Sequence, residues 1–335
     1  MPQKTIGFYS SQLCVRGTEV AIYDYAHYNE TILGNKSVIF HNGDSPNNDV
    51  LTVKKFSDRF PVIPLVGGFL PNSRIADGAI VSELLNKEIK RAGVDALYII
   101  KCGYKSDGIL PTACKTLIHC IGTSPPSEKH GDVYAYGSYW LSEHCSNGAI
   151  PAVPYMVDLP EVSDDLRLEL GIPENAIVFG RNGGADSFDI YWAKQVVAFV
   201  TQNRNDVYFL FQNTDKFYDH PRIIHLPSNP NLDYKVKFIN TCDAMIHARE
   251  IGESFGLSCG EFSIRNKPVI TWYGSQERNH IYILGDRGIY YNNPQELFDI
   301  LMSFQKQNPC QDFNCYREYS PERVMKTFKS VFLDG

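Results

Sequence analysis

The chain has 335 residues, of which 43% are hydrophobic and 21% charged, the composition of an ordinary globular protein long enough for two domains. Its formal net charge of −6, with no clustered basic excess, argues against a nucleic-acid-binding surface. No apolar run approaches the roughly 18 residues of a membrane span, so no transmembrane segment is expected.

Cysteine usage and the N-terminus both indicate a reducing compartment. The nine cysteines are scattered without C-x-x-C pairs, which predicts free thiols rather than a disulfide framework or a zinc site. The first residues lack the basic start and apolar stretch of a secretory signal. We therefore expect a cytoplasmic protein.

Residues 1–153 alternate short β-rich apolar segments with longer helical patterns, as parallel βα units do. The predicted strands are Thr5–Tyr9, Ser37–Phe40, Ala96–Ile100, Thr116–His119 and Asp132–Tyr136. The predicted helices are Thr18–Asn29, Ile80–Ala92 and Ser138–Ser146.

A proline-punctuated stretch, Ile150–Pro160, is the expected linker, because proline fixes extended backbone and disfavours helix before it. We place one domain at residues 1–153 and a second at 154–317. The C-terminal helix, 318–335, is expected to pack back on the first domain.

The alternating pattern restarts after the linker. The predicted strands are Ala176–Gly180, Val207–Gln212, Ile223–His225, Asp243–His247 and Pro268–Trp272. The predicted helices are Ser187–Thr201, Leu232–Asn240, Phe255–Arg265, Pro294–Gln305 and Pro321–Phe332. Together the two halves predict an α/β fold of two Rossmann-like, doubly wound domains facing a cleft, with ligands at the carboxyl ends of the strands.

Residues 252–270, GESFGLSCGEFSIRNKPVI, combine a predicted helix start with two acidic residues. Free backbone N–H groups at such a start, beside Gly256, form an anion site. Glu261 shares the apolar face of this helix with Leu257, so its carboxylate needs a partner. A ribose diol would serve, and so would Arg265 one turn further on.

Residues 179–189, FGRNGGADSFD, place Arg181 at the end of a strand, before a glycine loop and a helix capped by Asp186 or Ser187. An arginine fork at this edge of a sheet suits a phosphate group. The alternative is a surface arginine in a loop.

Glu253 and Glu261 stand eight residues apart, and ESFGLSCGE followed by PVI resembles the E-x7-E signature of retaining GT-B glycosyltransferases, family 4 in particular. The resemblance implies that Glu253 contacts the hydroxyls of a donor sugar and that Glu261 holds the ribose. It also implies a diphosphate held by backbone amides in the loop before the helix. The donor-binding residues in this segment are then Glu253, Ser254, Phe255, Gly256, Leu257 and Glu261.

The family's other motifs are matched in part. Arg181 corresponds to the family's phosphate-binding arginine, but Ser187 stands where the family has a lysine. Gly17 resembles the glycine loop that faces the donor phosphates and the acceptor, although one glycine before a helix is often only a turn. His119 resembles the histidine that contacts the donor sugar, with His130 as its competitor and a structural hydrogen bond as the alternative.

The resemblance implies a glycosyltransferase that retains anomeric configuration, takes a nucleotide-diphosphate sugar as donor and passes the sugar to a hydroxyl acceptor. Residues 1–153 would then face the acceptor, and Glu253, Arg181 and His119 would be the catalytic residues. No Asp-X-Asp triplet occurs, so neither a metal nor a further cofactor is expected. A phosphorylase of the same fold and a catalytically silent nucleotide- or sugar-binding module are the alternatives.

Overall fold

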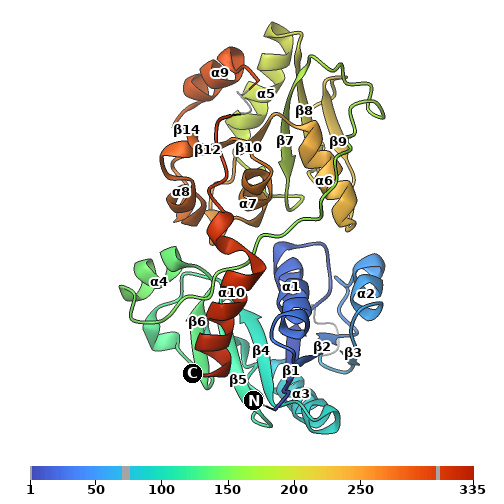
Figure 1. The fold of residues 1–335 in the computed structure, drawn as a ribbon, viewed down its shortest axis with the longest axis vertical. Helices are drawn as coiled ribbons and strands as arrows, with labels where there is room; N and C mark the ends of the chain where they lie inside the picture. Colours follow the sequence, from blue (N-terminus) through green and yellow to red (C-terminus); the bar gives the residue numbers. More distant parts are fainter. Residues whose placement is uncertain (1, 70–75, 307–309) are drawn as a thin grey trace. The chain divides into compact units, whose positions relative to one another are not determined.

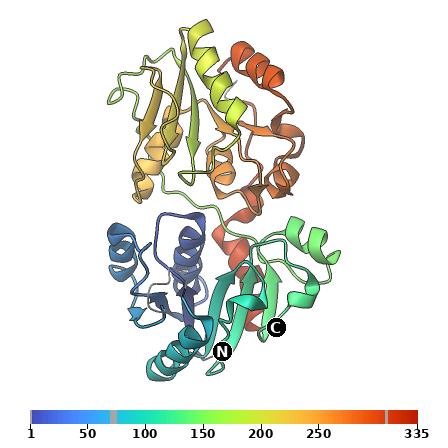
Figure 2. The same cartoon turned by 180° about the vertical axis from the view of Figure 1, so that it is seen from behind.

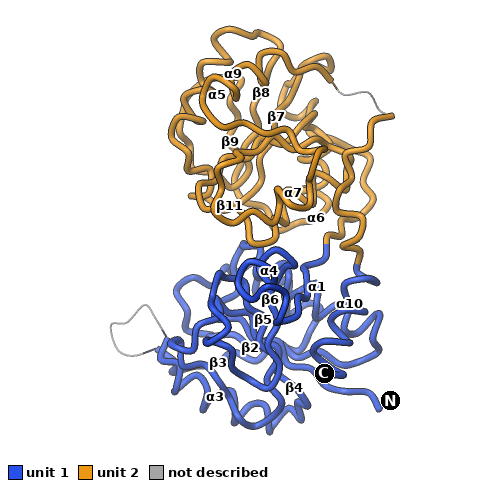
Figure 3. The backbone as a smooth tube through the Cα atoms, turned by 90° about the vertical axis from the view of Figure 1, so that its left-hand side faces the viewer, with its two compact units in different colours: residues 1–156, 321–335 blue, residues 157–320 orange. Residues whose placement is uncertain are grey.

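The computed structural model describes residues 2–69, 76–306 and 310–335. The chain divides into two compact units, and Figure 3 colours them separately. Unit 1 comprises residues 1–156 and 321–335, and unit 2 comprises residues 157–320. The chain thus crosses between the units twice, each time three residues beyond the boundary predicted from the sequence, at 153 and 317.

Unit 1 is built on a parallel sheet of six strands in the order β3-β2-β1-β4-β5-β6. Its strands are β1 (Thr5–Ser10), β2 (Lys36–Asn42), β3 (Val62–Leu65), β4 (Ala96–Lys101), β5 (Lys115–Cys120) and β6 (Val133–Tyr136). Its helices are α1 (Gly17–Thr31), α2 (Val50–Ser57), α3 (Gly78–Ala92), α4 (Tyr139–Ser146) and α10 (Pro321–Phe328). Short helical turns lie at η1 (Lys105–Asp107), η2 (Pro126–Glu128) and η5 (Lys329–Leu333).

The C-terminal segment belongs to unit 1, and Figure 1 shows α10 beside α1. The ring of Phe328 stacks on that of Tyr25 with their centroids 5.1 Å apart. Lys115 Nζ donates to the carbonyl oxygen of Gly335 at 2.6 Å. The last residues of the chain therefore pack on elements of unit 1 that lie more than two hundred positions earlier.

Unit 2 is built on a second parallel sheet, in the order β14-β12-β10-β7-β8-β9, and a small sheet of β11 and β13. The strands are β7 (Ile177–Asn182), β8 (Val207–Gln212), β9 (Ile223–Leu226), β10 (Ala244–His247), β11 (Gly252–Glu253), β12 (Val269–Trp272), β13 (Glu277–Arg278) and β14 (Ile289–Tyr291). The helices are α5 (Tyr191–Asn203), α6 (Leu232–Thr241), α7 (Leu257–Ile264), α8 (Asn279–Leu284) and α9 (Pro294–Ser303), with short turns at η3 (Gly285–Arg287) and η4 (Arg317–Tyr319).

β4 in unit 1 and β8 in unit 2 are buried on both faces over nearly their whole length, as expected of parallel strands covered by helices on each side. In unit 2, α5 and α9 lie side by side on one face, as seen from behind in Figure 2. Their contact includes the rings of Phe199 and Phe298, with centroids 5.4 Å apart. The doubly wound α/β fold predicted from the sequence is confirmed in both units.

Two predicted helix starts are wrong. The helix predicted from Ser187 begins at Tyr191, and neither Asp186 nor Ser187 caps it, because the Ser187 hydroxyl donates to Gly184 O at 3.0 Å inside the preceding loop. The helix predicted from Phe255 begins at Leu257, because Gly256 holds a left-handed conformation with φ of 92°. A Cβ at position 256 would lie 2.9 Å from the Cβ of His280, so this turn requires glycine.

None of the helices in the described ranges combines the length and the apolar character needed to cross a membrane.

Candidate functional site

The candidate site lies in unit 2, where the strand order of the sheet reverses. From β7 the chain moves outward to β8 and β9, and it then returns to the other side of β7 to form β10, β12 and β14. In sheets of this kind, ligands bind beyond the carboxyl ends of the two strands that flank the reversal. Here those strands are β7 and β10.

The two segments that follow β7 and β10 are held together by Asp189. Its backbone N–H donates to Ala248 O at 3.1 Å, and its carboxylate accepts from the backbone N–H of Glu250 at 2.7 Å. Arg249, between Ala248 and Glu250, is therefore held next to the segment that follows β7.

Arg181 lies at the end of β7 and is buried, with 3% of its surface exposed, which excludes the alternative of a surface arginine. Its guanidinium donates to Thr214 Oγ1 at 2.6 Å, to Gly184 O at 3.3 Å and to the hydroxyl of Ser187, all of them neutral oxygens. Its Nε atom has no partner among the described residues. Burial lowers the pKa of Arg181 to about 10, so the side chain is still a cation at neutral pH.

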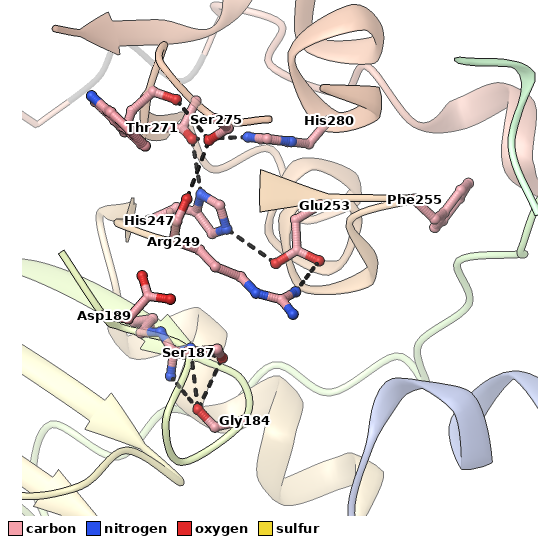
Figure 4. A network of polar contacts seen from close by, with 12 residues as sticks. Gly184, Ser187, Asp189, His247, Arg249, Glu253, Phe255, Thr271, Ser275 and His280 are labelled. Atoms are coloured by element: carbon pink, nitrogen blue, oxygen red, sulfur yellow. Dashed lines mark hydrogen bonds and ion pairs between the residues drawn. The ribbon is translucent and has the colours of Figure 1, made fainter. Parts of the chain in front are cut away.

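Glu253, on β11, is held by two donors, as Figure 4 shows. His247 Nε2 lies 3.1 Å from Oε1, and Arg249 Nη1 lies 3.0 Å from Oε2. Burial by itself would raise the pKa of Glu253, but the hydrogen bond from His247 and the charge of Arg249 outweigh it and lower the pKa to about 2. The carboxylate is therefore ionised, and its orientation is fixed.

A series of hydrogen bonds between side chains holds His247, the partner of Glu253, in place (Figure 4). His247 Nδ1 is 2.8 Å from Thr271 Oγ1, which is 3.1 Å from His280 Nε2. The hydrogens form one consistent series when His280 donates to Thr271, Thr271 donates to His247 and His247 donates to Glu253. Burial lowers the pKa of His280 to about 3, so the ring is neutral and donates as the Nε2–H tautomer.

Glu261, on α7, is buried as predicted, but its partner is not Arg265. Lys235 Nζ, on α6, lies 2.6 Å from Glu261 Oε1. Arg265 instead pairs with Glu161 at 3.1 Å. The ion pair with Lys235 leaves Glu261 Oε2 without a hydrogen-bond partner in the described parts of the chain.

The predicted diphosphate-binding amides surround the start of α7. The first backbone bond within the helix runs from Gly260 N to Gly256 O at 2.9 Å, so the amides of the first turn, beginning with Leu257, have no acceptor inside the helix. Phe255 is buried against the rings of Tyr316 and Tyr319, which fixes the backbone just before the helix. Ser254, between Glu253 and Phe255, is half-buried.

In unit 1, Gly17 is the first residue of α1 and follows the carboxyl end of β1. Two residues on, the buried side chain of Glu19 accepts from Thr18 Oγ1 at 2.8 Å and from Ser10 Oγ at 3.1 Å. Burial raises the pKa of Glu19 above its ordinary value. The predicted role of Gly17 toward donor phosphates and acceptor stays a prediction.

His119 is enclosed within unit 1. The hydroxyl of Tyr98 bonds to its Nδ1, and its Nε2 lies 2.8 Å from Val153 O, so both ring nitrogens are occupied and the residue has no exposed surface. Burial lowers the pKa of His119 to about 4. This is the geometry of a structural hydrogen bonder, and we do not assign His119 to the site.

His130, its competitor, is bonded through both nitrogens as well, to Lys101 Nζ at 2.9 Å and to Glu128 O at 2.6 Å.

Sequence reasoning missed the residues that orient Glu253, namely His247, Arg249, Thr271 and His280. One signal was present: a histidine and an arginine occur together in HARE, which begins at the last residue of a buried strand and precedes the acidic motif. Polar residues at the carboxyl end of a central parallel strand commonly serve a ligand site.

No protein-family model matches the chain, and no curated protein matches its sequence. The structure is similar to those of a glycosyltransferase from Rickettsia africae ESF-5 (TM-score 0.72, 15% identity, 100% of this chain and 99% of that chain) and of Anabaena Alr3699/HepE in complex with UDP and glucose (0.66, 13%, 98% and 96%). It is also similar to a putative UDP-N-acetylglucosamine 2-epimerase from Listeria monocytogenes (0.60, 12%, 99% and 98%). These similarities confirm the predicted GT-B fold.

Proposed function

We propose that the protein is a glycosyltransferase that takes a nucleotide-diphosphate sugar as donor, passes the sugar to a hydroxyl acceptor with retention of configuration, and needs no metal. The observation that carries the proposal is the buried cation Arg181, at the reversal of the sheet. Among the described residues its hydrogen bonds reach only neutral oxygens. The carboxylates of Glu253 and Asp189 act on this cation without a hydrogen bond to it, and an anionic ligand in direct contact would offset the cost of burying its charge.

The other site residues suit the parts of such a donor. The amides around Phe255, Gly256 and Leu257 would share the diphosphate with Arg181, in keeping with the affinity of helix starts for phosphate. Glu261 would accept from the ribose through Oε2, and Glu253, with Ser254 beside it, would contact the donor sugar. The similarity to HepE crystallised with UDP and glucose supports a uridine nucleotide as the first donor to test.

The chemistry would depend mainly on stabilising the leaving diphosphate with donors already in place, which is usually the largest electrostatic contribution to catalysis. Glu253 is already bound by His247 and Arg249, which suits it to orienting hydroxyl groups rather than to attacking carbon. We therefore propose attack by the acceptor on the face that the diphosphate leaves, with the departing phosphate taking the acceptor's proton.

The primary test is binding followed by turnover. Calorimetry with the four ribonucleoside diphosphates is expected to find one, UDP first, that binds much more tightly than its nucleoside. Hydrolysis of the matching nucleotide sugars, with and without candidate acceptors, then separates a transferase from a binding module. Failure of all four diphosphates to bind would overturn the proposal, and cleavage of a glycoside by free phosphate would indicate a phosphorylase.

Replacing Arg181 by alanine is expected to weaken diphosphate binding by about 1.5–3 kcal/mol, the cost of a lost charged hydrogen bond, while nucleoside binding stays the same. Calorimetry with UDP and uridine on the same preparation measures both, and the uridine value shows that the variant is folded. Arg287→Ala, which removes an exposed arginine paired with Asp312, is the control for net charge. Equal losses for UDP and uridine would contradict a phosphate-binding role.

Donor hydrolysis is expected to survive excess chelator, because arginine and backbone amides would supply the charge that a metal supplies elsewhere. The measurement is turnover before and after chelation, followed by addition of manganese or magnesium. Loss on chelation and recovery with the metal would show that the leaving-group chemistry is different.

A further inference from the structure

Arg249 occupies a central place in the site, although the resemblance to family 4 gives it no role. It follows β10 and lies between Ala248 and Glu250, the two residues whose backbones bond to Asp189 of the segment after β7. That segment also carries Gly184 and Ser187, the partners of Arg181. Arg249 is therefore fixed next to the loop that covers Arg181.

The two arginines share the same surroundings but differ in freedom. Each is within electrostatic range of the other, of Glu253 and of Asp189. Arg181 is enclosed, with 3% of its surface exposed. The side chain of Arg249 is 33% exposed, and its guanidinium points toward the carboxylate of Glu253 (Figure 4). Arg249 can thus change partners, and Arg181 cannot without opening its loop.

Three carboxylates, those of Glu253, Asp189 and Glu277, act on the arginines of the site. Glu253 is the carboxylate that pairs with Arg249, and the same group also accepts the hydrogen bond from His247. Ser187 stands where the resembling family has a lysine, and it contributes only a hydroxyl. That hydroxyl accepts a hydrogen bond from Arg181 and donates one to Gly184 O. One guanidinium alone would then face a diphosphate that carries more than one negative charge.

We propose that Arg249 is the second cation of the diphosphate subsite and replaces the charge that Ser187 does not provide. The inference rests on the proposed function and assigns a residue within it.

When the donor binds, Arg249 exchanges the carboxylate of Glu253 for a phosphate oxygen, which replaces one charged hydrogen bond by another. Glu253 does not lose its orientation, because His247 holds Oε1 and is itself held by Thr271 and His280. The exchange frees Oε2 to accept from a sugar hydroxyl. A single residue then couples arrival of the diphosphate to exposure of the sugar-binding carboxylate.

The experiment compares UDP with uridine by calorimetry on the unaltered chain and on Arg249→Gln, Arg249→Lys, Glu253→Gln and the control Arg287→Gln. Arg249→Gln is expected to weaken UDP binding about 10- to 150-fold, the loss of one charged hydrogen bond, and to leave uridine unchanged. Arg249→Lys keeps the charge and is expected to retain most of the affinity. Glu253→Gln releases Arg249 from its ion pair, so UDP should bind as tightly as before or more tightly.

The outcomes separate this inference from the function on which it rests. If the unaltered chain binds none of the ribonucleoside diphosphates, the proposed function falls and this inference falls with it. If UDP binds and Arg249→Gln changes its affinity less than about twofold, Arg249 is not part of the subsite, while the proposed function stands. Equal weakening by Arg249→Gln and Glu253→Gln would show that Arg249 acts only by holding Glu253, and it would also overturn the inference.

Discussion

Replacing Glu261 by alanine is expected to lower the free energy of unfolding by about 3–5 kcal/mol, because it leaves Lys235 charged and unpaired in a largely buried place. The two side chains are 7% and 13% exposed, and their charged atoms lie 2.6 Å apart. Chemical denaturation followed by fluorescence and circular dichroism measures the change. A loss below about 1 kcal/mol would mean that the pair is solvated, as exposed ion pairs are.

A double variant separates the structural role of Glu261 from its proposed contact with ribose. Lys235→Met combined with Glu261→Leu removes both charges and fills the space with apolar atoms, so most of the lost stability should return. Nucleoside and nucleoside-diphosphate binding should nevertheless stay weaker by about 1–3 kcal/mol, because the ribose diol has lost its acceptor. Full recovery of binding in this stable variant would rule out the ribose contact.

Replacing Glu253 by glutamine is expected to lower donor turnover about 10- to 100-fold and to leave the affinity for the sugar-free nucleoside diphosphate undiminished. Glutamine keeps an oxygen for the hydrogen bond from His247 but loses the charge that would orient the donor sugar. Turnover and calorimetry on the same variant give the two numbers. Glu250→Gln, which alters an exposed carboxylate three residues away, is the matched control.

The pH dependence gives an independent check on Glu253. Its pKa is lowered to about 2 in the folded chain, so the ionised form stabilises the fold at neutral pH, and that contribution is lost only as the pH falls toward this value. Turnover should therefore show no acid limb from this group above about pH 4. A limb near neutrality that disappears in Glu253→Gln would contradict the ionised state described here, and loss of nucleotide binding in that variant would contradict its placement at the sugar.

Local pattern was enough to predict most of the elements near the site. β7, β8 and β10 and helices α6 and α7 lie within about two residues of where alternating apolar runs and helical spacing placed them, because buried parallel strands and amphipathic helices leave distinct periods in the sequence. The pattern missed α2, which has eight residues, and several elements that are shorter or interrupted. β3 contains Pro64, α8 has six residues and β14 has three, too few to show a period.

The sequence predicted which segments form the candidate site, but it did not predict the contacts between their side chains. The acidic motif indicated Glu253 and Glu261, and the glycine loop indicated Arg181, because a strand that runs into a glycine turn and a helix start is a local feature. His119 was predicted from a similar local resemblance, that of a histidine at the end of a strand. In the structure its two ring nitrogens are bonded to Tyr98 and to Val153 O.

The sequence by itself thus determined the α/β class, the division into two units and the segments that meet at the sheet edge. Only the tertiary structure decided which partner each charged group takes. Glu261 pairs with Lys235, 26 positions earlier, rather than with Arg265 one turn away, and Glu253 is oriented by His247 with Thr271 and His280 behind it. The reason is physical: the period of a segment records which of its faces is buried, whereas the partner of a buried charge depends on how separate segments pack. The pairing of β10 with β12, for example, places Thr271 beside His247 and is not written in any one segment.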